Sequence, residues 1–237
     1  MSDTVSLLTK FNFLQNFASL ISAWINPAII HNLEKYHILK KVHYLTAIEN
    51  IEGDYLEFGV FTGSSFCHSI RVHQMQKKYC GEHTAMKFYG FDSFSGFGSM
   101  QSDENHPFYS QVDFNSNIEY VEKRIRRVAK NTEYKLVEGY FQDSLTSGPK
   151  SYGIDKSKII FIDSDTFSSA AQAFEFCSTT IQQGTYIILD DHFSYCGDIN
   201  RGVAGAFKEF IEKREIEVRL VFHYGMGGVF MLYQICE

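Results

Sequence analysis

Two short apolar runs in this chain end in carboxylates. The run IIFIDSD ends with Asp163 and Asp165, and the run YIILDD ends with Asp190 and Asp191. Each run is rich in isoleucine and is followed by a helix-like stretch, which is typical of neighbouring buried parallel strands whose carboxyl ends open onto a site. Four carboxylates at one rim repel one another unless a cation, a proton or a cationic ligand lies among them. The spacing therefore predicts a hard-metal site in an enzyme.

The residue types around these acids indicate which metal to expect. The set offers carboxylate oxygens, with no Cys nearby and one adjacent His, His192. Oxygen ligands favour Mg²⁺ or Ca²⁺ over zinc, and we expect Mg²⁺. His192 has two interpretations. It acts as a base or assists one, because imidazole titrates in the right range, or it is a supporting or surface histidine.

A glycine-containing turn follows the first strand-like segment, in Glu57-Phe-Gly59-Val-Phe-Thr-Gly63. The two glycines let a ligand approach the backbone closely, but the turn is neither a GxGxxG dinucleotide motif nor a P-loop. An acid at Glu57 favours a cation over a phosphate, and Asp92, after the next strand, is placed to accept hydrogen bonds from ribose hydroxyls. A cationic adenosine ligand of this kind is S-adenosylmethionine. The alternative is that the glycines serve tight packing and Asp92 caps a helix.

Strand-like and helix-like segments alternate from Gly53 onward. The expected strands are YLEFGV, KFYGFD, YKLVEG, KIIFID and TYIILD, and helical patterns cover residues 64–78, 116–130, 170–181 and 203–211. Residues 99–115 are expected to form a loop that could close over a substrate. EVRLVFHY and GVFMLYQI flank three glycines, which predicts a terminal hairpin. The pattern predicts an α/β fold, with a doubly wound, mostly parallel sheet, helices on both faces and an antiparallel addition at one side.

The chain divides into an N-terminal helical extension, residues 1–50, and a single α/β domain, residues 51–237. Two helices are expected, over residues 5–25 and 28–50. Polar residues interrupt the apolar stretch of residues 11–30 and Pro27 breaks it, so it is too polar to span a bilayer comfortably. We expect these helices to pack on the domain or on a second subunit, as a lid or as an oligomer contact. An interfacial membrane helix is the alternative.

Composition narrows the class of partner. The 237 residues, 44% of them hydrophobic, can bury one substantial core, and the net charge of −6 argues against a general nucleic-acid surface. The basic run of residues 123–127 is interpreted as the solvated face of an amphipathic helix. Five scattered cysteines suggest neither a disulfide framework nor a zinc knuckle, so we expect a cytoplasmic protein.

Five segments together resemble a known family. They are LEFGVFTGSS, GFDSFSGF, VEGYFQDSL, FIDSDTFSS and ILDDHF, in this order along the chain. They are similar to segments of the metal-dependent O-methyltransferases typified by macrocin O-methyltransferase (TylF-type), within the Rossmann-like class I methyltransferases. The similarity runs from about Gly53 to about Phe210 and is weaker at both ends of the chain.

The resemblance implies a seven-stranded sheet and an S-adenosylmethionine site across the carboxyl ends of the first four strands. Glu57, Gly59, Thr62, Gly63 and Ser64 would surround the methionine part, Asp92 the ribose, and Gly139 with Tyr140 or Phe141 the adenine. Ser93 and Asp163 are also expected to contact the cofactor.

The same resemblance implies a divalent cation on Asp163, Asp190 and Asp191, with Asp165 as the general base. It implies methyl transfer to a hydroxyl of a small acceptor, a sugar or a glycosylated metabolite. Phe167, Ser168 and His192 stand where the family has Tyr, Glu and Tyr, so the acceptor is expected to differ from a macrolide sugar. His223 and Tyr224 fall on the same rim and are acceptor-pocket candidates.

Two other functions compete with this hypothesis. A binding protein on a methyltransferase fold that has lost activity would not require the acids at positions 163, 165, 190 and 191, which are all present. A nicotinamide dehydrogenase should show GxGxxG and a catalytic YxxxK, and the nearest approach, Tyr120 with Lys123, has the wrong spacing.

Overall fold

A seven-stranded sheet forms the centre of the molecule. The computed structural model describes residues 11–80, 86–98, 104–109 and 114–235. The predicted helix start at residue 5 and much of the predicted loop 99–115 lie outside the described residues. The strands are β1 (Asp54–Phe58), β2 (Phe88–Asp92), β3 (Tyr134–Glu138), β4 (Ser157–Ile162), β5 (Tyr186–Leu189), β6 (Ile216–Tyr224) and β7 (Gly227–Ile235).

The strand order is β3-β2-β1-β4-β5-β7-β6. Strands β1 to β5 pair in parallel, whereas β7 runs antiparallel to both β5 and β6. The order reverses between β1 and β4, which creates the switch point where ligands bind in open α/β sheets. The predicted doubly wound sheet with a terminal hairpin is confirmed.

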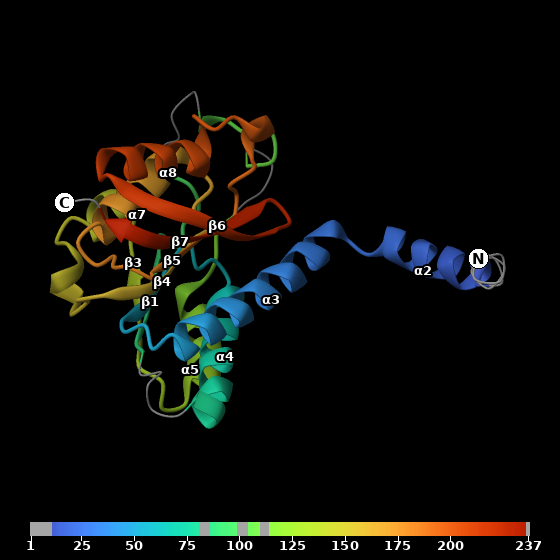
Figure 1. Ribbon diagram of the computed structural model, residues 1–237, viewed down its shortest axis with the longest axis horizontal. Coiled ribbons are helices and arrows are strands. Elements are labelled where there is room, and N and C mark those ends of the chain that lie inside the picture. The colour runs from blue at the N-terminus through green and yellow to red at the C-terminus, as the bar shows by residue number, and fades with distance from the viewer. Residues whose placement is uncertain (1–10, 81–85, 99–103, 110–113, 236–237) are drawn as a thin grey trace.

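Helices cover both faces of this sheet (Figure 1). One face carries α3 (Pro27–Ile48), α4 (Ser64–Cys80) and α5 (Ile118–Ala129), and the other carries α7 (Phe167–Cys177) and α8 (Gly202–Lys213). A short α6 (Phe141–Ser144) and two 3₁₀ turns, Pro149–Tyr152 and Tyr195–Gly197, complete the connections.

Alternation along the central strands produces two apolar cores, one on each face of the sheet. In β1, Leu56 and Phe58 pack into the core under α7 and α8, and Tyr55 packs into the core under α3 and α4. All six residues of β4 are buried. This explains why β4 reads as a continuous apolar run, because a central parallel strand is covered on both faces.

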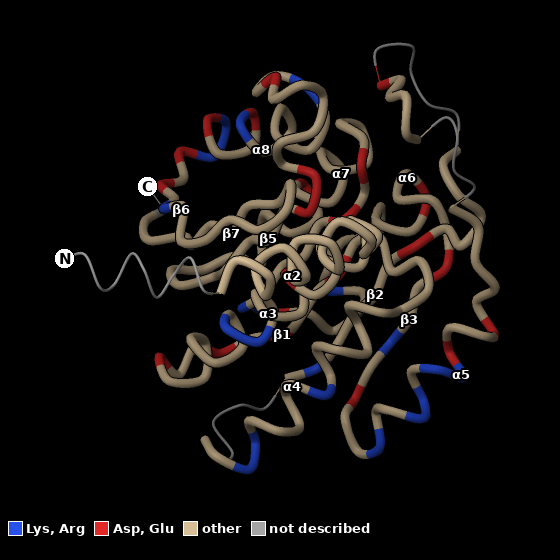
Figure 2. Tube along the Cα trace, turned by 90° about the vertical axis from the view of Figure 1, so that its right-hand side faces the viewer, with Lys and Arg blue, Asp and Glu red and all other residues tan. Residues whose placement is uncertain are grey.

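The basic run lies on α5, as predicted (Figure 2), and Lys123, Arg126 and Arg127 are exposed. Val121 and Ile125 are buried beneath the helix, and Arg126 pairs with Glu122 one turn away at 2.9 Å. Arg124 differs from the prediction of a purely solvated face. Its Nη1 donates to the carbonyl of Thr62 at 2.7 Å and so supports the turn after β1.

Residues 11–25, which we call the N-terminal arm, extend away from the domain (Figure 1). The arm contains α2 (Asn12–Trp24), in which every residue is exposed. The Asn26 side chain accepts from the backbone N–H of Ala28 and caps α3, and Pro27 occupies the first turn of that helix. The predicted break at Pro27 is therefore present, but α2 does not pack on its own domain.

Among the described residues, no single helix has the length and apolar character needed to cross a membrane. Helices α2 and α3 reach those criteria only when they are counted together, and they are bent by 96° at their break.

Candidate active site

The strand register brings the predicted acids to one edge of the sheet. The N–H of Asp163, directly after β4, donates to the carbonyl of Phe58 at 2.8 Å, and the N–H of Asp190, directly after β5, donates to the carbonyl of Ile162 at 3.0 Å. Both acids therefore continue the ladder by one residue and lie side by side at the switch point. Gly59 makes this approach possible, because a Cβ at its position would lie 1.8 Å from the carbonyl oxygen of Asp163.

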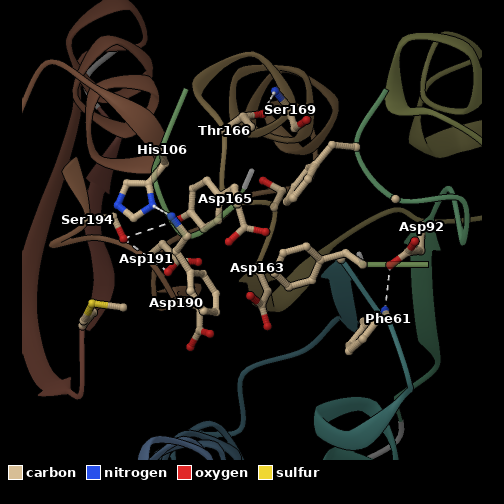
Figure 3. Close-up of a pocket in the computed structure, with 18 of the residues that line it drawn as sticks. Phe61, Asp92, His106, Asp163, Asp165, Thr166, Ser169, Asp190, Asp191 and Ser194 are labelled. Atoms are coloured by element: carbon tan, nitrogen blue, oxygen red, sulfur yellow. Dashed lines mark hydrogen bonds between the residues drawn. The ribbon is translucent and has the colours of Figure 1, made fainter. Parts of the chain in front are cut away.

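Three carboxylates form a compact cluster at this edge (Figure 3). Asp163, Asp165 and Asp191 each offer an oxygen within 4.8 Å of the other two. Asp165 adopts a left-handed backbone conformation with φ of 62°, which is uncommon for a residue other than glycine. Burial and the charges of Asp191 and Asp163 raise the pKa of Asp165 well above its ordinary value.

Asp190 is not part of that cluster and is held by three other side chains. Lys35 Nζ lies 2.6 Å from Asp190 Oδ2, and His31 Nε2 lies 3.2 Å from the same oxygen. The hydroxyl of Tyr224 donates to Asp190 Oδ1 at 2.6 Å. Although burial raises the pKa of Asp190, Lys35 and His31 hold it below its ordinary value. Asp190 is thus an ionised, fully hydrogen-bonded carboxylate beside the cluster.

Helix α3 supplies two of these partners, His31 and Lys35, and neither was predicted from the sequence. Lys35 also lies 3.0 Å from Asp163 Oδ2, so one ammonium bridges the acids that follow β4 and β5. A signal was present in the sequence: Lys35 occupies the same helical stripe as Ile38, Leu39 and Val42, all of which are buried. A lysine in an otherwise apolar stripe indicates a buried ion pair.

Asp92 organises the turn after β1. Its Oδ2 accepts from the backbone N–H groups of Val60 and Phe61, each at 2.7 Å, and its Oδ1 accepts from the N–H of Phe94 at 2.6 Å. The Phe61 contact is visible in Figure 3. Burial raises the pKa of Asp92, while these N–H groups act in the opposite direction. Asp92 therefore holds the loop in place and still lines the cavity, so its structural role does not exclude contact with a ligand.

The residues predicted to bind the cofactor fall into two groups. Gly59, Asp92, Ser93, Tyr140, Phe141 and Asp163 line one cavity of about 960 Å³. Glu57, Thr62, Gly63, Ser64 and Gly139 are not among its lining residues.

Glu57 and Gly63, two of the residues outside the cavity lining, have partners inside the protein. Glu57 is fully buried and accepts from the hydroxyls of Tyr55 and Ser65. Gly63 would place a Cβ 3.1 Å from Val121, so it serves the contact between the turn and α5.

The segment of residues 104–109 contributes four residues to the cavity lining: Glu104, His106, Phe108 and Tyr109. The Glu104 carboxylate accepts from the N–H of Ser168 at 2.6 Å, at the start of α7, and the Tyr195 hydroxyl donates to the Glu104 carbonyl at 2.9 Å. His106 packs on the Tyr109 ring at 4.4 Å between centroids and lines the cavity. These residues belong to the predicted loop, but their anchoring to α7 and to the turn after β5 was not predicted.

Neither of the two histidines singled out from the sequence, His192 and His223, lines the cavity. His192 packs against Phe193, Phe207 and Phe230, its Nδ1 is buried without a partner among the described residues, and it is absent from the cavity lining. Burial lowers its pKa. His223 is exposed and also lies outside the lining. Tyr224 reaches the site through Asp190. His31 and His106, which were not predicted, are the histidines that line the cavity.

Comparison with known proteins identifies the family. Residues 31–230 match the family model described as macrocin-O-methyltransferase (TylF). The chain belongs to this family. The match includes α3 from His31 onward and the strand ends that carry the acids.

One relative of known activity is distantly similar to this macrocin O-methyltransferase family member. An 8-demethyl-8-(2,3-dimethoxy-alpha-L-rhamnosyl)-tetracenomycin-C 4'-O-methyltransferase from Streptomyces olivaceus is 24% identical over 177 residues, which cover 70% of this chain and 64% of that protein. The match thus spans less than two thirds of that relative's length.

Two solved structures share the fold. The O-methyltransferase NovP has a TM-score of 0.67 at 19% identity, with 85% of this chain and 80% of that chain covered. The calicheamicin methyltransferase CalS11 has a TM-score of 0.68 at 16% identity, with 97% and 91% covered.

The side chains at this site fit the two groups expected from the sequence, S-adenosylmethionine and a divalent cation. The cluster of Asp163, Asp165 and Asp191 is an all-oxygen donor set of the type that Mg²⁺ and Ca²⁺ prefer, and no Cys or His belongs to it. The cavity lies within the size range of small-molecule sites, and it combines apolar rings with a few polar groups from the strand ends. One cavity therefore combines an all-oxygen acid cluster with the turn after β1 and several apolar rings.

Proposed function

We propose that this protein is an S-adenosylmethionine-dependent O-methyltransferase that needs a divalent cation, Mg²⁺, and that acts on a hydroxyl of a small sugar or glycosylated acceptor. One observation carries the proposal. In a member of the macrocin O-methyltransferase family, the Asp163, Asp165 and Asp191 cluster and the Asp92-supported turn open into the same cavity.

The turn residues would bind and orient the cofactor. Gly59, Asp92 and Ser93 lie along the switch-point side of the cavity, with Tyr140 and Phe141 beyond the end of β3. When bound, S-adenosylmethionine supplies an electrophilic methyl group: an O–C bond forms as the S–C bond breaks, the electron pair stays on sulfur and the hydroxyl proton leaves. Apolar rings around the cavity exclude water from this transfer.

The acids would hold the cation and receive the proton. Asp163 and Asp191 are the proposed ligands, and Asp165 is the proposed base, because its carboxylate belongs to the same cluster and lines the cavity. The predicted third ligand, Asp190, is instead engaged by Lys35, His31 and Tyr224. A divalent cation supplies Lewis acidity that makes a hydroxyl easier to deprotonate, and vicinal hydroxyls would suit it best.

Calorimetric titration with S-adenosylhomocysteine, with and without Mg²⁺, tests the cofactor assignment. Micromolar binding is expected, and absence of binding under both conditions would overturn the proposal. Methyl transfer to a panel of rhamnosides and catechols should then be lost on chelation with EDTA.

Asp191→Ala tests the cation assignment. This variant should bind S-adenosylhomocysteine within about threefold of the native protein and should lose Mg²⁺-dependent transfer. Loss of cofactor binding in Asp191→Ala would instead assign Asp191 to the cofactor site.

We also propose that the N-terminal arm binds a second copy of this chain. Large apolar side chains are exposed along it, including Phe13 at 69% and Trp24 at 84%. Phe13, Phe17 and Trp24 would each bury roughly 150–250 Å², a large part of the about 800 Å² that each partner gives to a standard interface. Residues 11–34 contain neither Lys nor Arg, whereas helices that lie on membranes are typically rich in both.

Light scattering after size-exclusion chromatography tests whether the N-terminal arm binds a second copy of the chain. The native protein should elute as a dimer or larger assembly, and the double variant Phe17→Ser with Trp24→Ser should be a monomer with unchanged helical content. Tyr120→Ser removes an exposed aromatic residue from α5 and is the matched control. A monomeric native protein, or a double variant that still associates, would contradict this proposal.

A further inference from the structure

Lys35 is a buried lysine in the apolar stripe of α3. Only 7% of its surface is exposed, and the next stripe residues, Ile38, Leu39 and Val42, are buried core. A lysine is rarely buried to this degree unless an acid pairs with it, since the ammonium otherwise loses its hydration without compensation. Its position is therefore explained by the groups that its ammonium contacts.

The ammonium of Lys35 joins two strand ends. It lies 2.6 Å from Asp190 Oδ2 and 3.0 Å from Asp163 Oδ2, and 5.6 Å from the centroid of the Phe161 ring. These partners come from β4 and from the residues that follow β4 and β5, far from α3 in sequence. The lysine thus supplies a fixed positive charge inside the acid-rich edge of the cavity.

Lys35 offsets part of the negative charge at this edge. Asp163, Asp165, Asp190 and Asp191 carry four negative charges when ionised, and Lys35 contacts two of these acids. His31 also contacts Asp190, but it adds a positive charge only when it is protonated. Although burial opposes them, Asp163 and Asp190 raise the pKa of Lys35 and keep its ammonium charged. Without the Lys35 charge, the same acids would attract an added cation more strongly.

We propose that Lys35 is the built-in counter-ion of this site, a positioning residue whose charge keeps Asp190 paired and weakens the attraction of the acid cluster for a divalent cation. This inference rests on the proposed function for the identity of the groups that enter the site. It makes a claim of its own, because it predicts tighter cation binding when the lysine charge is removed.

Calorimetric titration with Mn²⁺ in the absence of cofactor tests this inference. Lys35→Met and Lys35→Gln both remove the charge, and Gln keeps a hydrogen-bond donor for the acids. Both variants should bind Mn²⁺ at least about tenfold more tightly than the native protein, whereas Lys35→Arg, which keeps the charge, should stay within about threefold. The gain should shrink at high salt.

Lys41→Met is the matched control. Lys41 lies on the same helix, and its ammonium lies 4.9 Å from the centroid of the Phe222 ring. Lys41→Met therefore removes the same charge as Lys35→Met, but at a different contact. It should leave Mn²⁺ affinity within about threefold. Lys35→Gln decides the question if Lys35→Met does not fold.

Native-like or weaker Mn²⁺ binding by a folded, charge-neutral Lys35 variant would overturn the counter-ion role. If Mn²⁺ binds only to the neutral variants and not to the native protein, the counter-ion role stands and the cation dependence of the proposed function falls. If Mn²⁺ binds to none of them, both fall. Titration with S-adenosylhomocysteine in parallel reports separately on the cofactor site.

Discussion

Asp165 differs from the other two acids of the cluster in its backbone conformation. Its backbone is left-handed with φ of 62°, and its side chain lines the cavity together with those of Asp163 and Asp191. Its carbonyl oxygen lies 3.6 Å from the position that a Cβ on Gly202 would take, so the start of α8 packs closely against it. A strained residue fixed by its surroundings at a cavity is a good candidate for a chemical role.

Replacing Asp165 by Asn tests that role with little change in shape. Asp165→Asn should lower kcat about a hundredfold or more, because the amide cannot accept the hydroxyl proton. Affinity for S-adenosylhomocysteine should remain within about threefold, whereas Mn²⁺ should bind more weakly, because the variant removes one negative charge from the cluster. Initial rates and calorimetry measure these quantities, and Asp155→Asn, at an exposed acid, is the control. Near-normal turnover would remove Asp165 from the role and direct attention to His106, which lines the same cavity.

The turn after β1 connects the cofactor side of the cavity to the acid cluster. Gly59 has φ of 94° and packs directly on the backbone of Asp163, while Asp92 and Arg124 hold the residues that follow it. Any displacement of this turn would therefore move the residue after β4 as well. The two halves of the site share one backbone contact.

Gly59→Ala tests this contact at the level of the element. The variant should lose about 3 kcal/mol or more of the free energy of unfolding, because it adds a clash with the Asp163 carbonyl to the strain of a positive φ. Gly148→Ala is the control: Gly148 has φ of 70° with nothing within 4 Å of its added Cβ, and should cost about 1 kcal/mol. Urea denaturation measures both. Equal losses would show that the contact is not tight.

The stability of the whole molecule depends on pH, and Glu57 contributes to this dependence. Its pKa is raised on folding, whereas the pKa of a paired acid is usually lowered. Burial raises the pKa of Glu57 from 4.5 to about 7, against the opposing hydrogen bonds from Ser65 and Tyr55. The folded protein then binds a proton more tightly than the unfolded chain does. The contribution of Glu57 to stability is therefore greatest below about pH 4.5 and is lost as the pH rises to about 7.

Glu57→Gln removes this titration. Between about pH 4.5 and pH 7 the native free energy of unfolding should fall, relative to that of Glu57→Gln, by up to about 3 kcal/mol. Urea denaturation in EDTA at a series of pH values measures the difference. Glu122→Gln, on the outer face of α5, should run parallel to the native protein. Parallel curves for the native protein and Glu57→Gln would contradict the raised pKa.

The sequence by itself determined the order of the elements and the edge at which the site forms. Apolar runs with period-two and period-3.6 patterns are local, and the acids after KIIFI and YIIL are tied to strand ends by chain connectivity alone. Parallel pairing then brings Asp163 and Asp190 to one rim. For the same reason Gly59 and Asp92 lie beside the cavity.

Only the tertiary structure decided which side chains meet there. The residues that directly follow a strand can point in different directions. After β5, Asp190 contacts Lys35, Asp191 joins the acid cluster and His192 packs among phenylalanines. Lys35 contacts Asp163 across 128 positions of sequence, a contact set by how α3 docks on the sheet. No local pattern encodes that docking, because it depends on the fit of two complete surfaces that form only when the chain has folded.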